Sequence, residues 1–270
     1  MATITRTADR WFVAFTVEVK RHLPASNGKA GVVGVDVGVR HLAVVSTGQT
    51  VPNPRALEHS LRRLRRLNRE LSRRRPDSKR RERTSRRLSR VHARAADVRR
   101  DALHKLSAAL AVKYGTVVVE HLNVAGMLRN RRLARAISDS GMGELRRLLA
   151  YKTAWRGSRL LRAHPFFSSS KTCSDRGWVK AKLTLGERTF RCEACGLVID
   201  RDLNAARNLA KLVEQVARSG RETRNARGAD VGPGQAGLTA VKREAGTERR
   251  SGRTGTVGAQ TPAARIAEPC

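Results

Sequence analysis

The sequence has few acidic residues and no long apolar segment, and these absences exclude whole classes of protein. Its 270 residues include 56 Lys or Arg against 23 Asp or Glu, which gives a formal net charge of +33. No apolar run approaches the roughly 20 residues that span a bilayer. The first residues, MATITRTADRWFVAFTVEV, lack the apolar core of a secretory signal peptide. We therefore expect a cytoplasmic, nucleoid-associated protein with no membrane partner.

Cysteine is also scarce, and its placement argues against a disulfide framework. Cys173, Cys192 and Cys195 lie close together in the sequence, which is more typical of a metal site. The chain also contains no Walker loop, no Rossmann glycine fingerprint and no Ser-His-Asp arrangement. Any chemistry must therefore come from other residues, and the few carboxylates are the first candidates.

The positive charge predicts a polyanionic partner, because neutralising phosphates releases counterions and drives binding. It is concentrated in residues 55–105, which hold 20 Lys or Arg and 6 Asp or Glu. Leucines recur every three or four residues there, which predicts a first helix (Leu57, Leu61, Leu64, Leu67 and Leu71). A turn at residues 76–78 and a second helix to about Leu110 would complete a helical hairpin. We expect phosphate contacts from its arginines and from one beyond it (Arg62, Arg66, Arg73, Arg80, Arg87 and Arg131).

Apolar periodicity predicts the remaining elements. They are a half-buried strand over Ile4–Val19, a β-hairpin over Gly31–Val45, a buried strand over Ala111–Glu120, an amphipathic helix over Glu144–Leu161 and a last helix that ends at Gly220. Residues 220–270 are rich in Gly and Arg without a sustained period, so we expect them to be disordered.

Three acids stand at the ends of these elements, where an ionised carboxylate needs a partner. They are Asp36, Glu120 and either Asp200 or Asp202. Asp36 has an alternative role, in which it lies at the strand end and caps the turn. Carboxylates that hold two Mg²⁺ ions about 3.5–4 Å apart are suited to phosphodiester hydrolysis. The pattern therefore favours a metal-dependent nuclease.

Three segments resemble the split nuclease segments of the TnpB family, which are RNA-guided endonucleases encoded by insertion sequences and also classed as transposases. The segments are GVDVGVRHLAVVS, VVVEHLNVAGMLRNRRLARAISDSG and RTFRCEACGLVIDRDLNAARNLA, in family order within residues 1–218. The family is similar to the type V CRISPR effectors. The resemblance implies a Mg²⁺-dependent DNA endonuclease that acts in transposition and DNA recombination, with DNA and a guide RNA as partners.

The resemblance also implies an α/β fold: a RuvC-like, ribonuclease-H-type nuclease domain with an arginine-rich helical hairpin insertion and a zinc ribbon before the last acid. Asp36, Glu120 and Asp202 match the family's catalytic acids, which would hold two Mg²⁺ ions. Only the family pattern favours Asp202 over Asp200. The hairpin corresponds to an insertion that lies against the guide RNA and its DNA hybrid, where base pairing reads the sequence.

The resemblance divides the chain into seven segments. Residues 1–28 are a remnant of an N-terminal wedge β domain, 29–54 the first RuvC-like segment, 55–110 the basic hairpin, 111–163 the second RuvC-like segment, 164–199 the zinc-ribbon insert, 200–219 the third RuvC-like segment and 220–270 a disordered basic tail. The family carries a longer N-terminal lobe for RNA handling and target-adjacent motif recognition. We expect that only its last strand or two remain here.

The zinc ribbon departs from the family pattern at one ligand. Cys192 and Cys195 form the second C-x-x-C pair, whereas Arg176 replaces the second cysteine of the pair that Cys173 begins. Three thiolates would bind Zn²⁺ more weakly, with a fourth ligand from water, His164 or Asp175. The alternative is a metal-free loop packed by Leu183, Leu185 and Phe190. Together with the reduced N-terminal lobe, this departure leaves a second function open: a catalytically inactive nucleic-acid-binding remnant.

Overall fold

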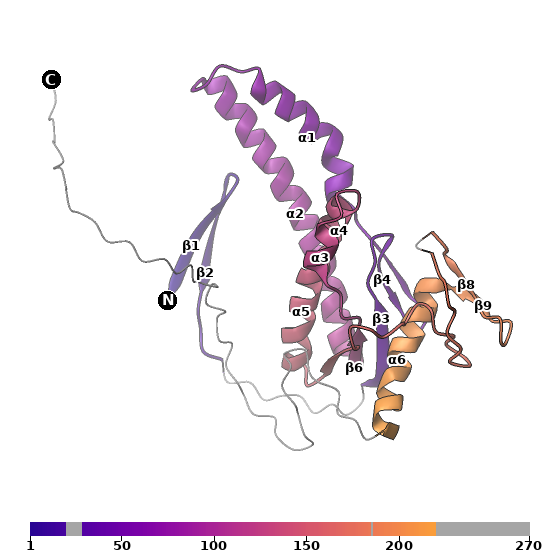
Figure 1. Cartoon of the computed structure of the whole chain (residues 1–270). Helices are drawn as coiled ribbons and strands as arrows, with labels where there is room; N and C mark the ends of the chain where they lie inside the picture. The colour runs from indigo at the N-terminus through magenta and orange to yellow at the C-terminus, as the bar shows by residue number, and fades with distance from the viewer. Residues whose placement is uncertain (20–28, 185, 220–270) are drawn as a thin grey trace, which may run out of the picture. The chain divides into compact units, whose positions relative to one another are not determined.

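A mixed five-stranded sheet forms the centre of the computed structural model, which describes residues 1–19, 29–184 and 186–219 (Figure 1). Its strand order is β5-β4-β3-β6-β7. The strands are β3 (Ala30–Asp36), β4 (His41–Val45), β5 (Thr50–Pro52), β6 (Tyr114–Val119) and β7 (Arg159–Arg162). β3, β4 and β5 are antiparallel, whereas β6 and β7 run parallel to β3. Our predictions for Leu185, Gly220 and residues 220–270 lie outside the described residues.

Strands β3 and β4 form the predicted hairpin, with Val35 opposite Val45 and Asp36 opposite Val44. Successive strand residues face opposite sides of a sheet. Val33 and Val35 pack into the main core, whereas Gly34 faces a helix on the other side. This part of the strand is therefore buried on both faces, as the sequence predicts.

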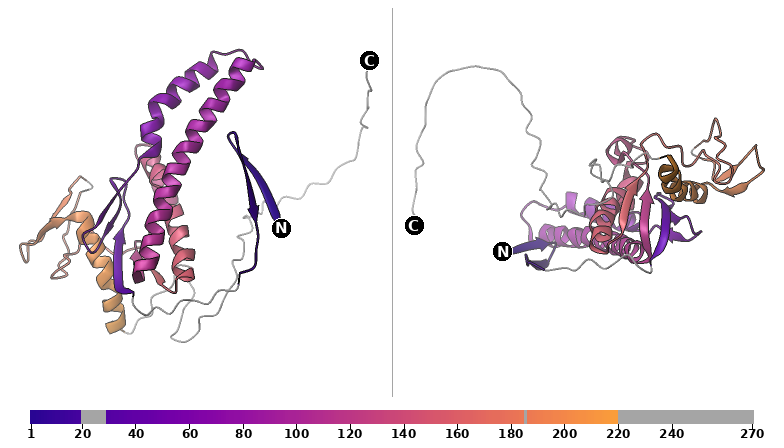
Figure 2. Two further views of the ribbon diagram at one scale, coloured as in Figure 1. Left: turned by 180° about the vertical axis from the view of Figure 1, so that it is seen from behind. Right: turned by 90° about the horizontal axis from the view of Figure 1, so that it is seen from below.

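Helices cover both faces of the sheet (Figure 2). The last part of α2 (Lys79–Lys113) and α5 (Met142–Trp155) pack on one face, in the core that contains Leu103, Leu145 and Leu148. Helix α6 (Arg201–Ser219) packs on the other face, where Leu209 contacts Val118. The sheet is therefore buried on both sides along β3 and β6.

The arginine-rich segment forms two helices, α1 (Ala56–Ser72) and α2, which pack through the predicted leucine stripe. Leu64 and Leu67 are buried against Val91. Ser78 caps α2 by accepting a hydrogen bond from the Arg81 amide at 3.2 Å. α2 continues to Lys113, so residues 111–113 are helical and the strand predicted from Ala111 begins at Tyr114. The reason is that alanine and lysine are strong helix formers and extend the helix up to the valines.

An acid from a distant segment caps α1. Asp139, which is buried, accepts hydrogen bonds from the amides of Leu57 and Glu58 at 3.0–3.3 Å and pairs with Arg99 of α2. Arg55, at the N-cap position itself, makes no side-chain cap. Asp139 therefore joins the base of the two helices to the segment that follows β6.

The segment after β6 contains α3 (Val124–Leu128), α4 (Ala134–Ser140) and α5. The single helix predicted over Glu144–Leu161 is wrong at its end, because α5 stops at Trp155 and the chain returns as strand β7. Gly157 adopts φ +66°, which ends the helix. Ser158 then donates a hydrogen bond to the Tyr114 carbonyl at 2.8 Å, at the start of β6.

The N-terminal residues form a two-stranded hairpin of β1 (Ala2–Thr7) and β2 (Arg10–Phe15), and not the single half-buried strand predicted over Ile4–Val19. The chain reverses at Ala8, whose φ is +56°. All residues of both strands are exposed. The alternation that predicts one strand therefore continues across a turn that carries no glycine, asparagine or proline.

A small insert lies between β7 and α6. Its strands are β8 (Thr189–Arg191) and β9 (Val198–Asp200), which pair antiparallel. Phe190 is fully buried there beside Cys173 and Cys192, with Trp178 packed against them. Within the described residues, no helix is long and apolar enough to cross a membrane.

Candidate functional site: two clusters of metal-ligand residues and an arginine hollow

Asp36 and Glu120 lie side by side at one edge of the sheet. β3 and β6 are parallel neighbours in which Val35 pairs with Val119, so the next residue of each strand is an acid. The register of two strands that are far apart in the sequence therefore brings these two carboxylates together.

Both carboxyl groups are partly buried, and this burial raises the pKa of each above its usual range. The negative charges of Glu120 and Asp202 raise the pKa of Asp36 further, so that it lies well above the usual range. Two groups oppose the shift at Glu120: the Ser169 hydroxyl, which donates a hydrogen bond to its Oε1, and the positive charge of Arg201. The site thus concentrates negative charge where it is poorly solvated.

Asp202 reaches the same edge because α6 lies directly on β3. A Cβ atom on Gly34 would lie 1.9 Å from the Ala206 carbonyl oxygen, so only glycine permits this approach. Asp202 precedes Ala206 by one helical turn and is in the first turn of α6. Its Oδ1 lies 3.4 Å from Arg201 Nε.

Asp200, the other candidate for the third acid, caps α6. Its Oδ1 accepts hydrogen bonds from the backbone amides of Asp202 at 2.9 Å and Leu203 at 3.1 Å. Asp200 is exposed, whereas Asp202 is partly buried. The helix-capping role that the sequence leaves open for Asp200 therefore belongs to it.

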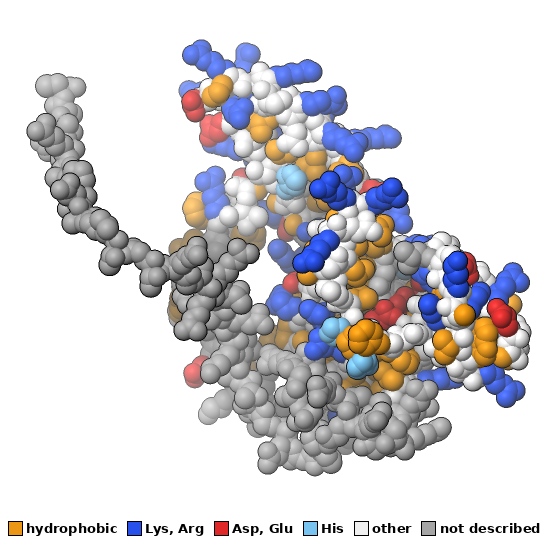
Figure 3. Space-filling model, in the orientation of Figure 1, with side chains coloured by type: hydrophobic (Ala, Val, Ile, Leu, Met, Phe, Trp, Pro, Cys, Tyr) orange, Lys and Arg blue, Asp and Glu red, His pale blue; other side chains and the backbone are white. Residues whose placement is uncertain are grey.

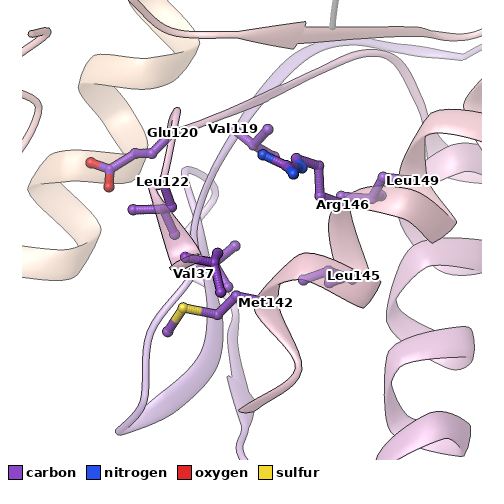
Figure 4. A pocket seen from close by; sticks show the side chains of 9 residues that line it. Val37, Val119, Glu120, Leu122, Met142, Leu145, Arg146 and Leu149 are labelled. Carbon is purple, nitrogen blue, oxygen red and sulfur yellow. The ribbon is translucent and has the colours of Figure 1, made fainter. Parts of the chain in front are cut away.

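Glu120 also borders a small apolar cavity of about 20 Å³ between β6 and α5. Its carboxylate points away from the Met142 and Leu145 side chains and towards α6 (Figure 4). The oxygen atoms of Asp36, Glu120 and Asp202 do not all lie within 4.8 Å of one another, since the described residues contain one such group of three His, Cys, Asp or Glu ligands, and it consists of thiols. The charges of the three acids therefore influence one another's pKa values, although their oxygen atoms are not all within 4.8 Å of one another.

The thiol cluster consists of Cys173, Cys192 and Cys195, whose sulfur atoms all lie within 4.8 Å of one another. Cys173 Sγ and Cys195 Sγ are 3.6 Å apart. A tetrahedral zinc site with Zn–S bonds of about 2.3 Å places its sulfur atoms about 3.8 Å apart. The donor type and the spacing both fit a bound zinc ion. His164 and Asp175 do not join the cluster within that distance.

Two matching turns position these thiols. In the first turn, the Cys173 amide donates to the Trp178 carbonyl at 2.7 Å and the Gly177 amide donates to the Cys173 carbonyl at 2.9 Å. In the second turn, the Cys192 amide donates to the Leu197 carbonyl at 2.9 Å and the Gly196 amide donates to the Cys192 carbonyl at 3.0 Å, at the same sequence spacing. Gly177 and Gly196 adopt φ of +73° and +72°.

Arg176 therefore occupies, in the first turn, the place of Cys195 in the second. Its side chain is exposed. The first turn therefore keeps the backbone geometry of the second without a second cysteine.

A hollow of about 980 Å³ lies between the ends of α1 and α2 farthest from the sheet. Eight arginines and a single acid, Glu70, line it together with two hydroxyl residues. Of the arginines predicted to contact phosphate, four line this hollow, whereas Arg62 and Arg131 do not (Arg66, Arg73, Arg80 and Arg87). Lys and Arg side chains gather over the visible α1–α2 surface (Figure 3).

Several polar residues that position the site are not among the site residues predicted from the sequence. Ser169 contacts Glu120, and two buried asparagines of α6, Asn204 and Asn208, bind the backbone of the segment that contains Ser169. A partial signal exists for the asparagines, since polar residues spaced by four on the apolar face of a helix need buried partners. No such signal exists for Ser169.

Two family models match the chain. A model described as "Probable transposase" (OrfB_IS605) matches residues 14–131, and a Cas12f1-like TNB domain matches residues 143–209. A structure titled as a CRISPR-Cas12f ternary complex matches 74% of this chain and 42% of its own chain with a TM-score of 0.51 at 20% identity, a likeness of fold.

Curated relatives agree with these models. A protein of Streptomyces pristinaespiralis named "Putative RNA-guided DNA endonuclease" is 41% identical over 202 residues, which are 75% of this chain and 50% of the relative. The protein of the same description called InsQ, from Escherichia coli, is 31% identical over 77% of this chain and 55% of its own length. This chain thus spans about half the length of these relatives. These matches place the chain in the TnpB-like, OrfB/IS605 family.

Proposed function

We propose that the chain is the nuclease part of an RNA-guided DNA endonuclease of a transposable element, and that Asp36, Glu120 and Asp202 hold its divalent ions. One observation carries this proposal: two acids end adjacent parallel strands at the same sheet edge, and α6 adds the third across Gly34. The strand order and the mixed strand directions support a RuvC-like, ribonuclease-H-type domain.

The residues present fit a hard divalent cation. Carboxylate oxygens are the ligands that Mg²⁺ prefers, and the pKa values of Asp36 and Glu120 are raised by burial and by neighbouring negative charge, which a cation would offset. When bound, Mg²⁺ would activate a water molecule and stabilise the leaving oxygen of a phosphodiester. Arg201 supplies part of the compensating charge, and Asp200 fixes the first turn of the helix on which Asp202 stands.

The arginine hollow supports a nucleic-acid partner. A guide RNA paired with DNA presents phosphates in a regular backbone, and arginine binds phosphate through a planar fork of donors. We propose that the hollow holds this backbone while base pairing reads the sequence. Arg62 and Arg131 would add charge outside it.

The thiol cluster supports a structural zinc ion, which Cys173, Cys192 and Cys195 would hold. Such an ion would join the two turns and thereby stabilise the insert between β7 and α6. We propose that this insert is a zinc ribbon in which Arg176 takes the place of one ligand.

Cleavage of labelled DNA by the purified protein, with whatever RNA co-purifies, tests the proposed function. We expect Mg²⁺-dependent cleavage by the natural sequence and none by Asp36→Ala, with nucleic-acid binding unchanged in both. Cleavage that persists in Asp36→Ala would contradict the assignment of the site. Binding without cleavage in any divalent ion would favour the alternative, an inactive nucleic-acid-binding protein. Its supporting observation is that, among the described residues, the three acids do not form a group with all ligand atoms within 4.8 Å of one another.

A further inference from the structure

One short segment connects the carboxylate cluster with the thiol cluster. It runs from Ser169 to Ser174, between β7 and β8. At one end the Ser169 hydroxyl donates a hydrogen bond to Glu120 Oε1, and Ser169 is 3% exposed. Near the other end Cys173, 1% exposed, supplies a thiol. Three residues therefore separate a contact with the acids from a ligand of the proposed zinc ion.

Two asparagines of α6 hold this segment. Asn208 Nδ2 donates to the Ser169 carbonyl at 2.8 Å, and Asn204 Nδ2 donates to the Thr172 carbonyl at 2.7 Å. Asn204 Oδ1 accepts from the Ser174 amide at 2.9 Å. Both asparagines are buried, so breaking these bonds would leave polar groups unpaired, which is costly.

The same helix thus fixes both ends of the segment and also carries Asp202. Asn204 and Asn208 are four residues apart and share one face of α6. Buried hydrogen bonds from Asn204 and Asn208 therefore join the segment that contains Ser169 to the helix that contains Asp202. The Ser169 hydroxyl occupies one oxygen of Glu120 and fixes the rotation of the carboxylate, which leaves the other oxygen for an ion.

We propose that Ser169 is a positioning residue for Glu120 and that the segment held by Asn204 and Asn208 couples the thiol site to the carboxylate site. The inference rests on the proposed function, because it assumes that the carboxylates bind a divalent ion. Zinc at the thiols would hold Cys173 in place, and with it the hydroxyl four residues earlier. Removal of zinc would then weaken ion binding at the acids.

Binding of Mn²⁺ to the full chain, followed by electron paramagnetic resonance, tests this coupling without a cleavage assay. Asp36→Ala defines which bound Mn²⁺ belongs to the carboxylates. We expect Ser169→Ala to weaken that binding about 10- to 100-fold, as for other residues that orient metal ligands. Ser169→Thr keeps the hydroxyl and should bind Mn²⁺ close to the natural sequence. Zinc content and the circular dichroism spectrum should be the same in the natural sequence, Ser169→Ala and Ser169→Thr.

A second comparison addresses the coupling itself. We expect Cys192→Ser, which removes a thiol, to weaken Mn²⁺ binding in the natural background and to have no further effect in Ser169→Ala, since both changes break one connection. Equal effects of Cys192→Ser in both backgrounds, or unchanged Mn²⁺ affinity in Ser169→Ala, would overturn the inference. Absence of any Mn²⁺ that depends on Asp36 would instead contradict the proposed function.

Discussion

Gly34 of β3 lies directly against the backbone of Ala206 in α6, and this close approach brings the helix that carries Asp202 onto the strand that carries Asp36. A side chain at position 34 has no room, because the nearest atoms are a carbonyl oxygen and an amide nitrogen, which cannot rotate away. The placement of two acids from different segments therefore depends on a residue that has no side chain.

We expect Gly34→Ala to displace α6 and to lower the free energy of unfolding by about 1–3 kcal/mol, the usual cost of overpacking. Metal-dependent cleavage should fall with it. Urea unfolding and the DNA cleavage assay measure the two effects. Gly31→Ala is the matched control in the same strand, since a Cβ there meets nothing within 4 Å. Equal effects of the two substitutions would mean that the contact does not position α6.

Asp36→Asn should stabilise the protein in the absence of divalent ions. Burial and the charges of Glu120 and Asp202 raise the pKa of Asp36 in the folded state above its value of about 3.9 in the unfolded chain. The folded state then binds the proton more tightly, so stability falls as the pH rises from about 4 through the raised pKa. Above that pH range Asp36 is ionised and its charge destabilises the folded state, whereas asparagine carries no charge.

Thermal unfolding in EDTA near neutral pH measures this gain, and the difference from the natural sequence should vanish below about pH 4. Saturating Mg²⁺ should stabilise the natural sequence more than Asp36→Asn, because the ion binds the folded state. Asp101→Asn is the control, since Asp101 is an exposed acid paired with Lys105. A lower melting temperature for Asp36→Asn in EDTA would count against this account.

Asp200 and Asp202 should separate stability from activity. Asp200→Ala removes the cap of α6, and we expect it to lower the free energy of unfolding by about 0.5–2 kcal/mol. Its metal-dependent cleavage should be retained at a temperature where the protein is folded. Asp202→Asn should abolish cleavage with little effect on stability. Loss of cleavage in Asp200→Ala together with retained cleavage in Asp202→Asn would mean that Asp200, and not Asp202, is the third acid of the site.

Much of this architecture follows from the sequence, and the exceptions have physical causes. The valines of β3, β4 and β6 and the leucines of α1 give strong periodic signals, so the sequence predicts these elements and the acids that follow them. β7 has only four residues, RLLR, and directly follows a helix, so its leucines fit the helical period as well. Its identity as a strand depends on pairing with β6.

The residues that position the site cannot be predicted from local sequence patterns. Ser169 stands in a run of three serines, and its contact with Glu120 bridges 49 positions of sequence. Asp139 likewise caps a helix that begins more than 80 residues earlier. Such contacts arise from the tertiary fold, and a single sequence contains no period that marks them.

Arg176→Cys should raise bound zinc towards one ion per chain. The turn that contains Arg176 already has the geometry of the turn that contains Cys195, so a fourth thiol would need no change of backbone. We expect a higher melting temperature that EDTA abolishes. Arg176→Ser removes the charge without adding a ligand and is the control. Unchanged zinc content in Arg176→Cys would imply that another ligand already completes the site.

Arginines of the hollow should contribute to the salt dependence of nucleic-acid binding. The slope of log K against log salt on a duplex should become shallower by about 0.9 for each phosphate that the protein no longer neutralises. We expect this change in Arg73→Ala and in Arg80→Ala, measured by fluorescence anisotropy between about 50 and 200 mM salt. Lys105→Ala, on α2 but outside the hollow, is the control of equal charge. Slopes that match this control would place the nucleic acid elsewhere.

Helix α2 passes into β6 without an intervening residue, since the helix ends at Lys113 and the strand begins at Tyr114. At 1.5 Å per residue, its 35 residues span about 52 Å. One end borders the arginine hollow, and the other continues into the strand that Glu120 follows. The arginine hollow and the strand beside the acids are therefore joined by one continuous helix with no loop between them, so a displacement of one end of α2 would also displace the other.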